Sequence, residues 1–165
     1  MRRSTTMNGG SLTALALGAA AGAAGTTALN AASYVDMTIR ARPASTTPQD
    51  TAAALAAVTH INVPGTETVR SNRLAGLGPL LGITTGVGVG AVVGLVMSMG
   101  WPTRRSALGV VATAGAMIAA NAPMTLLRVS DPTTWTAGDW ATDVVPHLAY
   151  GATVAAVLHR FATNR

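Results

Sequence analysis

Asp139, Asp143 and His147 are the residues of this chain whose types and spacing come nearest to a chemical site. Each lies four residues from the next, so on a helix that begins near Trp140 the second carboxylate and the imidazole share one face. A carboxylate beside an imidazole favours the protonated ring, and such a pair can sense or relay protons. The spacing therefore predicts a candidate proton site at Asp139, Asp143 and His147.

Two other roles fit the same three residues. A trio of one histidine and two aspartates can bind a divalent metal, but one helix rarely supplies a whole coordination shell, so we predict no metal site. Alternatively, Asp139 or Asp143 caps the helix, while His147 lies at the membrane interface and bonds to a carbonyl group. Both the proton role and the capping role stay open at this point.

Motifs for catalysis are missing from the rest of the chain. The sequence has no phosphate-binding glycine loop between a strand and a helix, no nucleophile elbow and no histidine-rich metal motif. It has no cysteine, which removes disulfides and thiolate nucleophiles from consideration. Polar residues are sparse in the apolar runs, whereas a membrane enzyme would gather them at one depth. We expect no catalytic residue, no cofactor and no enzymatic activity.

The composition is that of a membrane protein. Hydrophobic residues make up 49% of the 165 residues and charged residues only 10%, whereas a soluble domain carries about a quarter charged residues. The apolar residues lie in four runs of bilayer length, at about 12–35, 75–99, 106–127 and 143–161. We predict one membrane domain over 1–165, an all-α bundle of four transmembrane helices. Its long connection, 36–74, is expected to hold a short surface helix at about 48–61.

Glycines recur every four residues in the second apolar run. The set is Gly78, Gly82, Gly86, Gly90 and Gly94, and Gly18 and Gly22 repeat the spacing in the first run. On a helix this period puts the glycines in one stripe, which lets another helix approach closely in lipid. We predict a glycine-zipper second helix that drives self-association. The expected partners are the lipid bilayer and a second copy or another membrane protein.

Charge predicts the orientation of the spans. The N-terminus, the turn at 101–105 and the C-terminus hold six of the eleven arginines and no acid, while the other side holds five arginines and all six acids. Because arginine is enriched in cytoplasmic flanks, we predict an inner-membrane protein with both termini in the cytoplasm. Arginine pairs beside apolar runs are membrane anchors, so no nucleic acid partner is expected. Retention of the first run as a helix is expected, with cleavage as a signal peptide the alternative.

Two resemblances add to this reading. The stretch 30–37, followed by 40–48, resembles a string in uncharacterised four-helix membrane proteins of actinobacteria. The end of the third run at Pro123 and Met124, the loop 131–140 and the start of the fourth run at His147 and Leu148 are similar in layout to YagU-like inner-membrane proteins associated with acid resistance. The first resemblance implies a location and the second implies a role in acid tolerance.

The functional expectation is a non-enzymatic inner-membrane protein with a structural or acid-stress role in the envelope. A conduit for small solutes or ions is one alternative, since Asn30, Asn121 and His147 could wet a lumen between glycine-rich helices. The other alternative is an accessory subunit of a membrane complex. Interhelical hydrogen bonding is the simpler role for Asn30 and Asn121.

Overall fold

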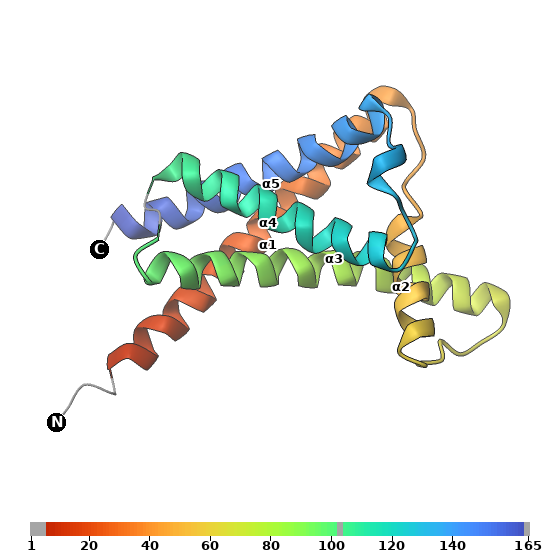
Figure 1. Cartoon of the computed structure of the whole chain (residues 1–165), viewed down its shortest axis with the longest axis horizontal. Coiled ribbons are helices and arrows are strands. Elements are labelled where there is room, and N and C mark those ends of the chain that lie inside the picture. Colours follow the sequence, from red (N-terminus) through yellow and green to blue (C-terminus); the bar gives the residue numbers. More distant parts are fainter. Residues whose placement is uncertain (1–5, 102–103, 164–165) are drawn as a thin grey trace.

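The computed structural model describes residues 6–101 and 104–163, and all regular structure in these residues is helical. The predicted all-α class is therefore confirmed. The described residues form five helices and a short 3₁₀ turn before the last of them, arranged as in Figure 1. In chain order they are α1 (Thr6–Arg40), α2 (Thr47–Val58), α3 (Glu67–Ser98), α4 (Arg105–Leu126), the 3₁₀ turn Pro132–Thr134 and α5 (Ala137–Thr163).

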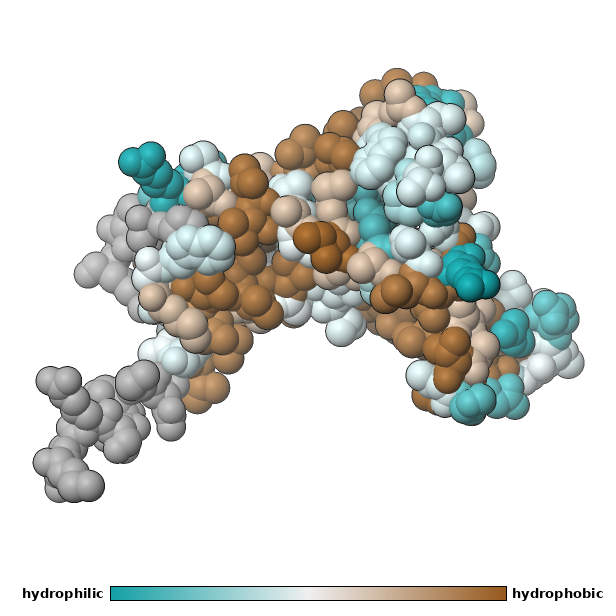
Figure 2. All heavy atoms as spheres, viewed as in Figure 1, coloured by the Kyte–Doolittle hydropathy of each residue, from teal (hydrophilic) through white to brown (hydrophobic). Residues whose placement is uncertain are grey.

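Within the described residues, α1, α3, α4 and α5 are the helices long and apolar enough to cross a membrane. Large apolar side chains on them face outward: Val110 is 69% exposed and Ile118 67%. Figure 2 shows an apolar band across the middle of the molecule, with hydrophilic colour gathered at the end that carries α2 and the start of α3. Because such a surface suits lipid and not water, the fold is that of a multi-pass membrane protein.

The helices extend beyond the predicted apolar runs. Helix α3 begins at Glu67 and α5 at Ala137, several residues before the predicted starts at 75 and 143. Hydropathy marks only the part of a helix that lies in hydrocarbon, whereas a helix can continue into the interface where water or side chains satisfy its ends. The short helix expected at 48–61 is α2, and it ends at Val58 because His60 takes a left-handed φ of 56°.

Helices α1 and α3 cross with their backbones in contact. A Cβ atom at Gly22 would lie 2.5 Å from the carbonyl oxygen of Gly86, and one at Gly90 would lie 2.5 Å from the carbonyl oxygen of Gly18. A Cβ atom at Gly94 would lie 2.5 Å from the carbonyl oxygen of Ala14. Gly22 of α1 and Gly90 and Gly94 of α3 therefore leave no room for a side chain, and these glycines serve contacts within one chain.

The other two glycines of the stripe have different surroundings. Gly78 lies against the first turn of α2, where a Cβ atom would come 2.8 Å from the amide nitrogen of Gln49. Gly82 has no such neighbour within 4 Å. Next to Gly78, Leu74 packs with Ala52 and Val63 in a small second core between α2 and α3. The glycine stripe of α3 thus contacts α1 along one part and α2 at Gly78, and it faces open space at Gly82.

Helix α5 completes the core by packing along both α1 and α4. Tyr150 is fully buried there, and its hydroxyl donates to the carbonyl oxygen of Gly86 at 2.6 Å. Its ring lies over Gly25, where a Cβ atom would come 2.7 Å from Tyr150 Cδ2. On the α4 side, a Cβ atom at Gly151 would lie 2.5 Å from the carbonyl oxygen of Gly109. Glycine therefore permits each of these close approaches.

The α1–α3 crossing predicts a sharp difference between two glycines of one stripe. Gly90→Leu places a side chain against the backbone of α1 and should lower the free energy of unfolding by about 1–3 kcal/mol or more. Gly82→Leu, the matched control, should change it by less than about 0.5 kcal/mol. Unfolding in mixed micelles titrated with sodium dodecyl sulfate measures both. Equal losses for the two variants would mean that the crossing does not hold the fold together.

The buried phenol gives a second prediction. Tyr150→Phe keeps the ring and removes the hydroxyl that donates to Gly86, so it should cost about 0.6–1.7 kcal/mol, the range for hydrogen bonds between membrane helices. The only other tyrosine, Tyr34, is 63% exposed, and Tyr34→Phe should leave stability unchanged. The same unfolding titration applies, and a cost no larger than that of Tyr34→Phe would contradict a stabilising role for the bond.

Candidate functional site

Asp139 lies in the first turn of α5 and is occupied by capping. Its Oδ2 atom accepts hydrogen bonds from the Thr136 amide at 2.9 Å and from the Thr136 hydroxyl at 2.6 Å. The Thr136 hydroxyl also lies 3.2 Å from the Asp139 amide, which completes a reciprocal capping arrangement. Of the two roles left open for Asp139, the structure supports capping.

Asp143 and His147 face each other one turn apart on α5. His147 Nδ1 donates to the backbone carbonyl of Asp143 at 2.7 Å, and the same nitrogen lies 3.4 Å from Asp143 Oδ1. His147 is only 8% exposed, and Asp143 is also largely covered. In the neutral ring the donating Nδ1 leaves Nε2 as an acceptor, so Nε2 is the atom that would take up a proton.

Asn121 joins this pair from the neighbouring helix α4. Its Nδ2 group donates to Asp143 Oδ2 at 3.0 Å, an interhelical hydrogen bond of the kind predicted for this residue. The other end of the amide, Oδ1, is buried and has no hydrogen-bond partner among the described residues. A buried acceptor without a partner costs about 1–3 kcal/mol and calls for an explanation.

The Asn121 amide suits either protonation state of Asp143. An ionised carboxylate only accepts hydrogen bonds and is matched by the amide Nδ2 group, as observed. A protonated carboxyl group also donates, and a rotation of the amide would turn Oδ1 toward it as the acceptor. Asn121, Asp143 and His147, hereafter the α4–α5 polar cluster, can therefore hold a proton while keeping a hydrogen bond between the two helices.

Charged groups from α1 lie beside the α4–α5 polar cluster. Arg40 Nη1 donates to the Thr142 hydroxyl at 2.8 Å, next to Asp143 in the chain. The same nitrogen lies 3.6 Å from Asp36 Oδ1, while the other Asp36 oxygen accepts from Arg42 Nε at 2.5 Å. One hydrogen bond from Arg40 thus ties the end of α1 to the start of α5, and Asp36 pairs with both Arg40 and Arg42.

Asp131, in the loop between α4 and α5, has a different environment from Asp143. Its Oδ1 atom accepts from the Thr133 hydroxyl at 2.7 Å and from the Thr133 amide at 2.9 Å. These two bonds hold the pKa of Asp131 below its usual range. Asp131 therefore stays ionised in mild acid, and a response to mild acid at this end of the molecule must come from other groups.

The structure thus brings two of the three predicted residues together and separates the third. No group of three or more histidine and carboxylate side chains in the described parts of the chain is placed to hold a metal ion. Two functional details were not anticipated: Thr136 as the cap, and Tyr150 one turn beyond His147. The first has a signal in the sequence, since Thr136 and Asp139 have the spacing of a capping box.

A scan against protein-family models, a search of curated proteins and a search of solved structures each found no match to this chain. The site must be interpreted from its own geometry.

Proposed function

We propose that this protein is a non-enzymatic component of the inner membrane that helps the envelope to tolerate acid, through protonation of the α4–α5 polar cluster. One observation carries the proposal: the Asp143 carboxylate lies against His147 on its own helix and accepts a hydrogen bond from Asn121 on α4. Histidine is the side chain whose charge changes between pH 5 and 8, and here it is buried at a contact between two helices.

Proton uptake would strengthen the attraction between His147 and Asp143 and would change the hydrogen bond between Asp143 and Asn121. A proton on His147 Nε2 creates an imidazolium beside the Asp143 carboxylate, which is an ion pair in a poorly hydrated site. A further proton on Asp143 removes that attraction and favours the rotated amide of Asn121. Arg40 and Asp36, the charged groups of α1 nearest to this end of α5, are paired with each other and with Arg42 or Thr142. The α4–α5 polar cluster is therefore the group of side chains at this end of the bundle that we expect to respond to protons.

The packing favours a structural role over a conduit. At Gly86, Gly90 and Gly94 the space that a lumen would need is occupied by α1 and by Tyr150. Asn121 is engaged with Asp143 and does not line a channel along the glycine stripe. We therefore propose a structural role for this protein and not a role as a conduit.

Self-association stays a prediction, and the packing narrows where it could occur. Most of the glycine stripe contacts α1 or α2 of the same chain, so a second copy would have to pack near Gly82, which has open space. Gly82→Leu would then lower the oligomeric state in mild detergent without lowering the stability of the monomer. An unchanged oligomer in that variant would place any self-association on another surface.

The acid response can be tested at His147. In cells that depend on this protein for survival at low pH, His147→Gln should lower survival toward that of cells without it, because the neutral amide cannot take up a proton. His159→Gln, on the opposite end of α5, is the matched control and should survive like the parent. Membrane levels of each variant are measured by immunoblotting. Parental survival of His147→Gln at normal protein levels would contradict the proposal.

Asp143 gives a complementary physical measurement. Asp143→Asn resembles the protonated carboxyl group and can bond to the Asn121 oxygen, so the purified variant should keep the link between α4 and α5 and stay within about 0.5 kcal/mol of the parent in stability. Asp143→Ala removes the carboxylate that lies against both neighbours and should cost about 1–3 kcal/mol. Thermal unfolding in detergent measures both. An equal loss of stability in the two variants would count against the cluster.

Orientation decides whether the cluster meets external acid. Helix α1 begins and α5 ends at one end of the bundle, and the α4–α5 polar cluster lies toward the other (Figure 1). With cytoplasmic termini, a reporter that fluoresces only in the cytoplasm should be bright when fused after Arg165 and dark when inserted near Thr134. The reverse pattern would put the cluster on the cytoplasmic side and would remove its exposure to external acid.

A further inference from the structure

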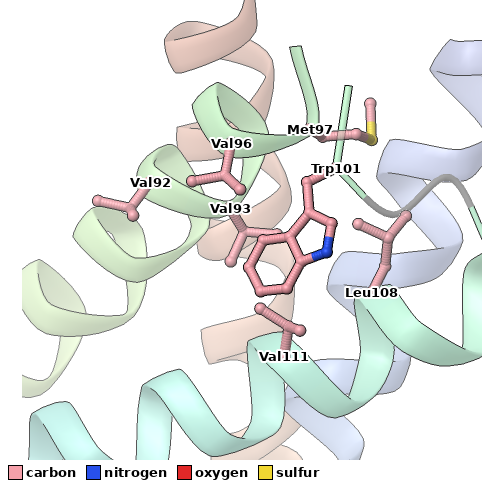
Figure 3. A pocket seen from close by; sticks show the side chains of 7 residues that line it. All are labelled: Val92, Val93, Val96, Met97, Trp101, Leu108 and Val111. Carbon is pink, nitrogen blue, oxygen red and sulfur yellow. The ribbon is translucent and has the colours of Figure 1, made fainter. Parts of the chain in front are cut away.

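An apolar pocket lies between α3 and α4, at the opposite end of the bundle from the α4–α5 polar cluster. It has a volume of about 210 Å³. Val93, Val96 and Met97 line it from α3, Leu108 and Val111 from α4, and the Trp101 indole lies between the two helices (Figure 3). The proposed acid response uses none of these residues.

The pocket suits a hydrocarbon chain. Its lining is aliphatic apart from one thioether and one indole, so a water molecule there would lack the two to four polar partners that it needs. An engineered apolar cavity of about 150 Å³ stays dry and binds benzene, so this pocket has room for a segment of acyl chain. Val92 and Trp101 at its edge are 58% and 60% exposed, so the pocket opens on the lipid-facing surface.

The charged residues next to the pocket in the described part of the chain are arginines. Arg104 and Arg105 lie in the chain between Trp101 and Leu108, and Arg105 begins α4 about 5 Å along the helix axis from Leu108. Neither arginine forms an ion pair with a described residue. All six aspartate and glutamate residues of the sequence belong to the predicted opposite side, so no acidic side chain among the described residues pairs with these guanidinium groups.

The Trp101 indole adds a polar group at the same level. No described residue pairs with its ring N–H. Tryptophan at a membrane interface keeps its ring in the apolar region and its N–H near the headgroups. The apolar pocket, the indole and the two arginines thus follow one another from hydrocarbon toward water, in the order of the parts of a phospholipid.

We propose that this pocket binds an anionic phospholipid, with part of an acyl chain between α3 and α4 and its phosphate group held by Arg104 and Arg105. An uncharged or zwitterionic lipid would fill the apolar part but would gain less from the arginines. Near a membrane surface each arginine contributes about 1 kcal/mol of attraction to anionic lipid, which corresponds to about a fivefold preference per residue.

Trp101 is a natural probe of the site. Trp135→Phe/Trp140→Phe leaves Trp101 as the single tryptophan, since the chain has three. This variant is reconstituted in vesicles containing phosphatidylglycerol and phosphatidylcholine, with bromine on the acyl chains of one lipid at a time. Brominated phosphatidylglycerol should quench Trp101 at least fivefold more effectively than its share of the lipid predicts. Equal quenching by the two brominated lipids would overturn the proposal.

Three further variants separate the parts of the site. Arg104→Gln/Arg105→Gln should abolish most of the preference for phosphatidylglycerol, and Val111→Phe should reduce quenching by filling the pocket. In the matched control, Trp101→Phe/Trp140→Phe, the remaining Trp135 at the far end should not respond to the arginine substitutions. If Val111→Phe leaves the preference intact, the arginines attract lipid to the surface and the pocket is not its site.

A measurement on the unaltered chain covers the case in which Val111→Phe does not fold. Native mass spectrometry of the full chain, released from detergent with equal amounts of both lipids, should show one retained phosphatidylglycerol. The Arg104→Gln/Arg105→Gln variant should retain at least fivefold less of it. Equal retention of the two lipids by the unaltered chain would contradict the proposal independently of any pocket variant.

Discussion

The backbone contact between α1 and α3 is the constraint on which the rest of the fold depends. In lipid, apolar side chains gain little by leaving one hydrocarbon environment for another, so helices associate through dispersion and weak Cα–H···O contacts at short range. Gly18 and Gly22 meet Gly86, Gly90 and Gly94 at that range. Since any side chain there would separate the helices, the crossing fixes where α5 can enter and where Tyr150 can reach Gly86.

The two ends of the bundle differ because the helices leave this crossing in different directions (Figure 1). Toward the acidic end, α1 runs on to Arg40, which bonds to Thr142 at the start of α5. Helix α2 covers α3 at Gly78. Glycines thus occupy the crossing, and the charged groups lie at the ends of the helices, where water or headgroups can solvate them.

The class of fold and most of the glycines in the α1–α3 contact could be predicted from the sequence. The first depends on composition, and the second depends on the four-residue spacing of the glycines. The sequence could not say which helix would occupy the glycine stripe, since a four-residue period predicts a close contact but not its partner. Gly82 belongs to the pattern and has open space, whereas Gly25 and Gly151 lie outside it and form close contacts.

In the candidate site, contacts within one helix could be predicted from the sequence, whereas the contact between two helices could not. The approach of Asp143 to His147 follows from helical spacing and was predictable, and so was capping by Thr136. The bond from Asn121 to Asp143 depends on how α4 and α5 align, 22 residues apart in the chain. The same two helices approach closely where a Cβ atom at Gly151 would meet Thr113 and Gly109, a contact for which the sequence offered no recognised pattern.

Helix α4 is the element on which both proposed activities would act. Its inner face carries Asn121 near one end and Leu108 and Val111 of the apolar pocket near the other. The seam between α3 and α4 contains that pocket, whereas the seam between α1 and α3 has backbone against backbone. A void can be filled or closed at little cost, but a close-packed contact cannot shift without strain. The space beside α4 therefore lies at the α3–α4 seam, while the α1–α3 seam is closed by backbone contacts.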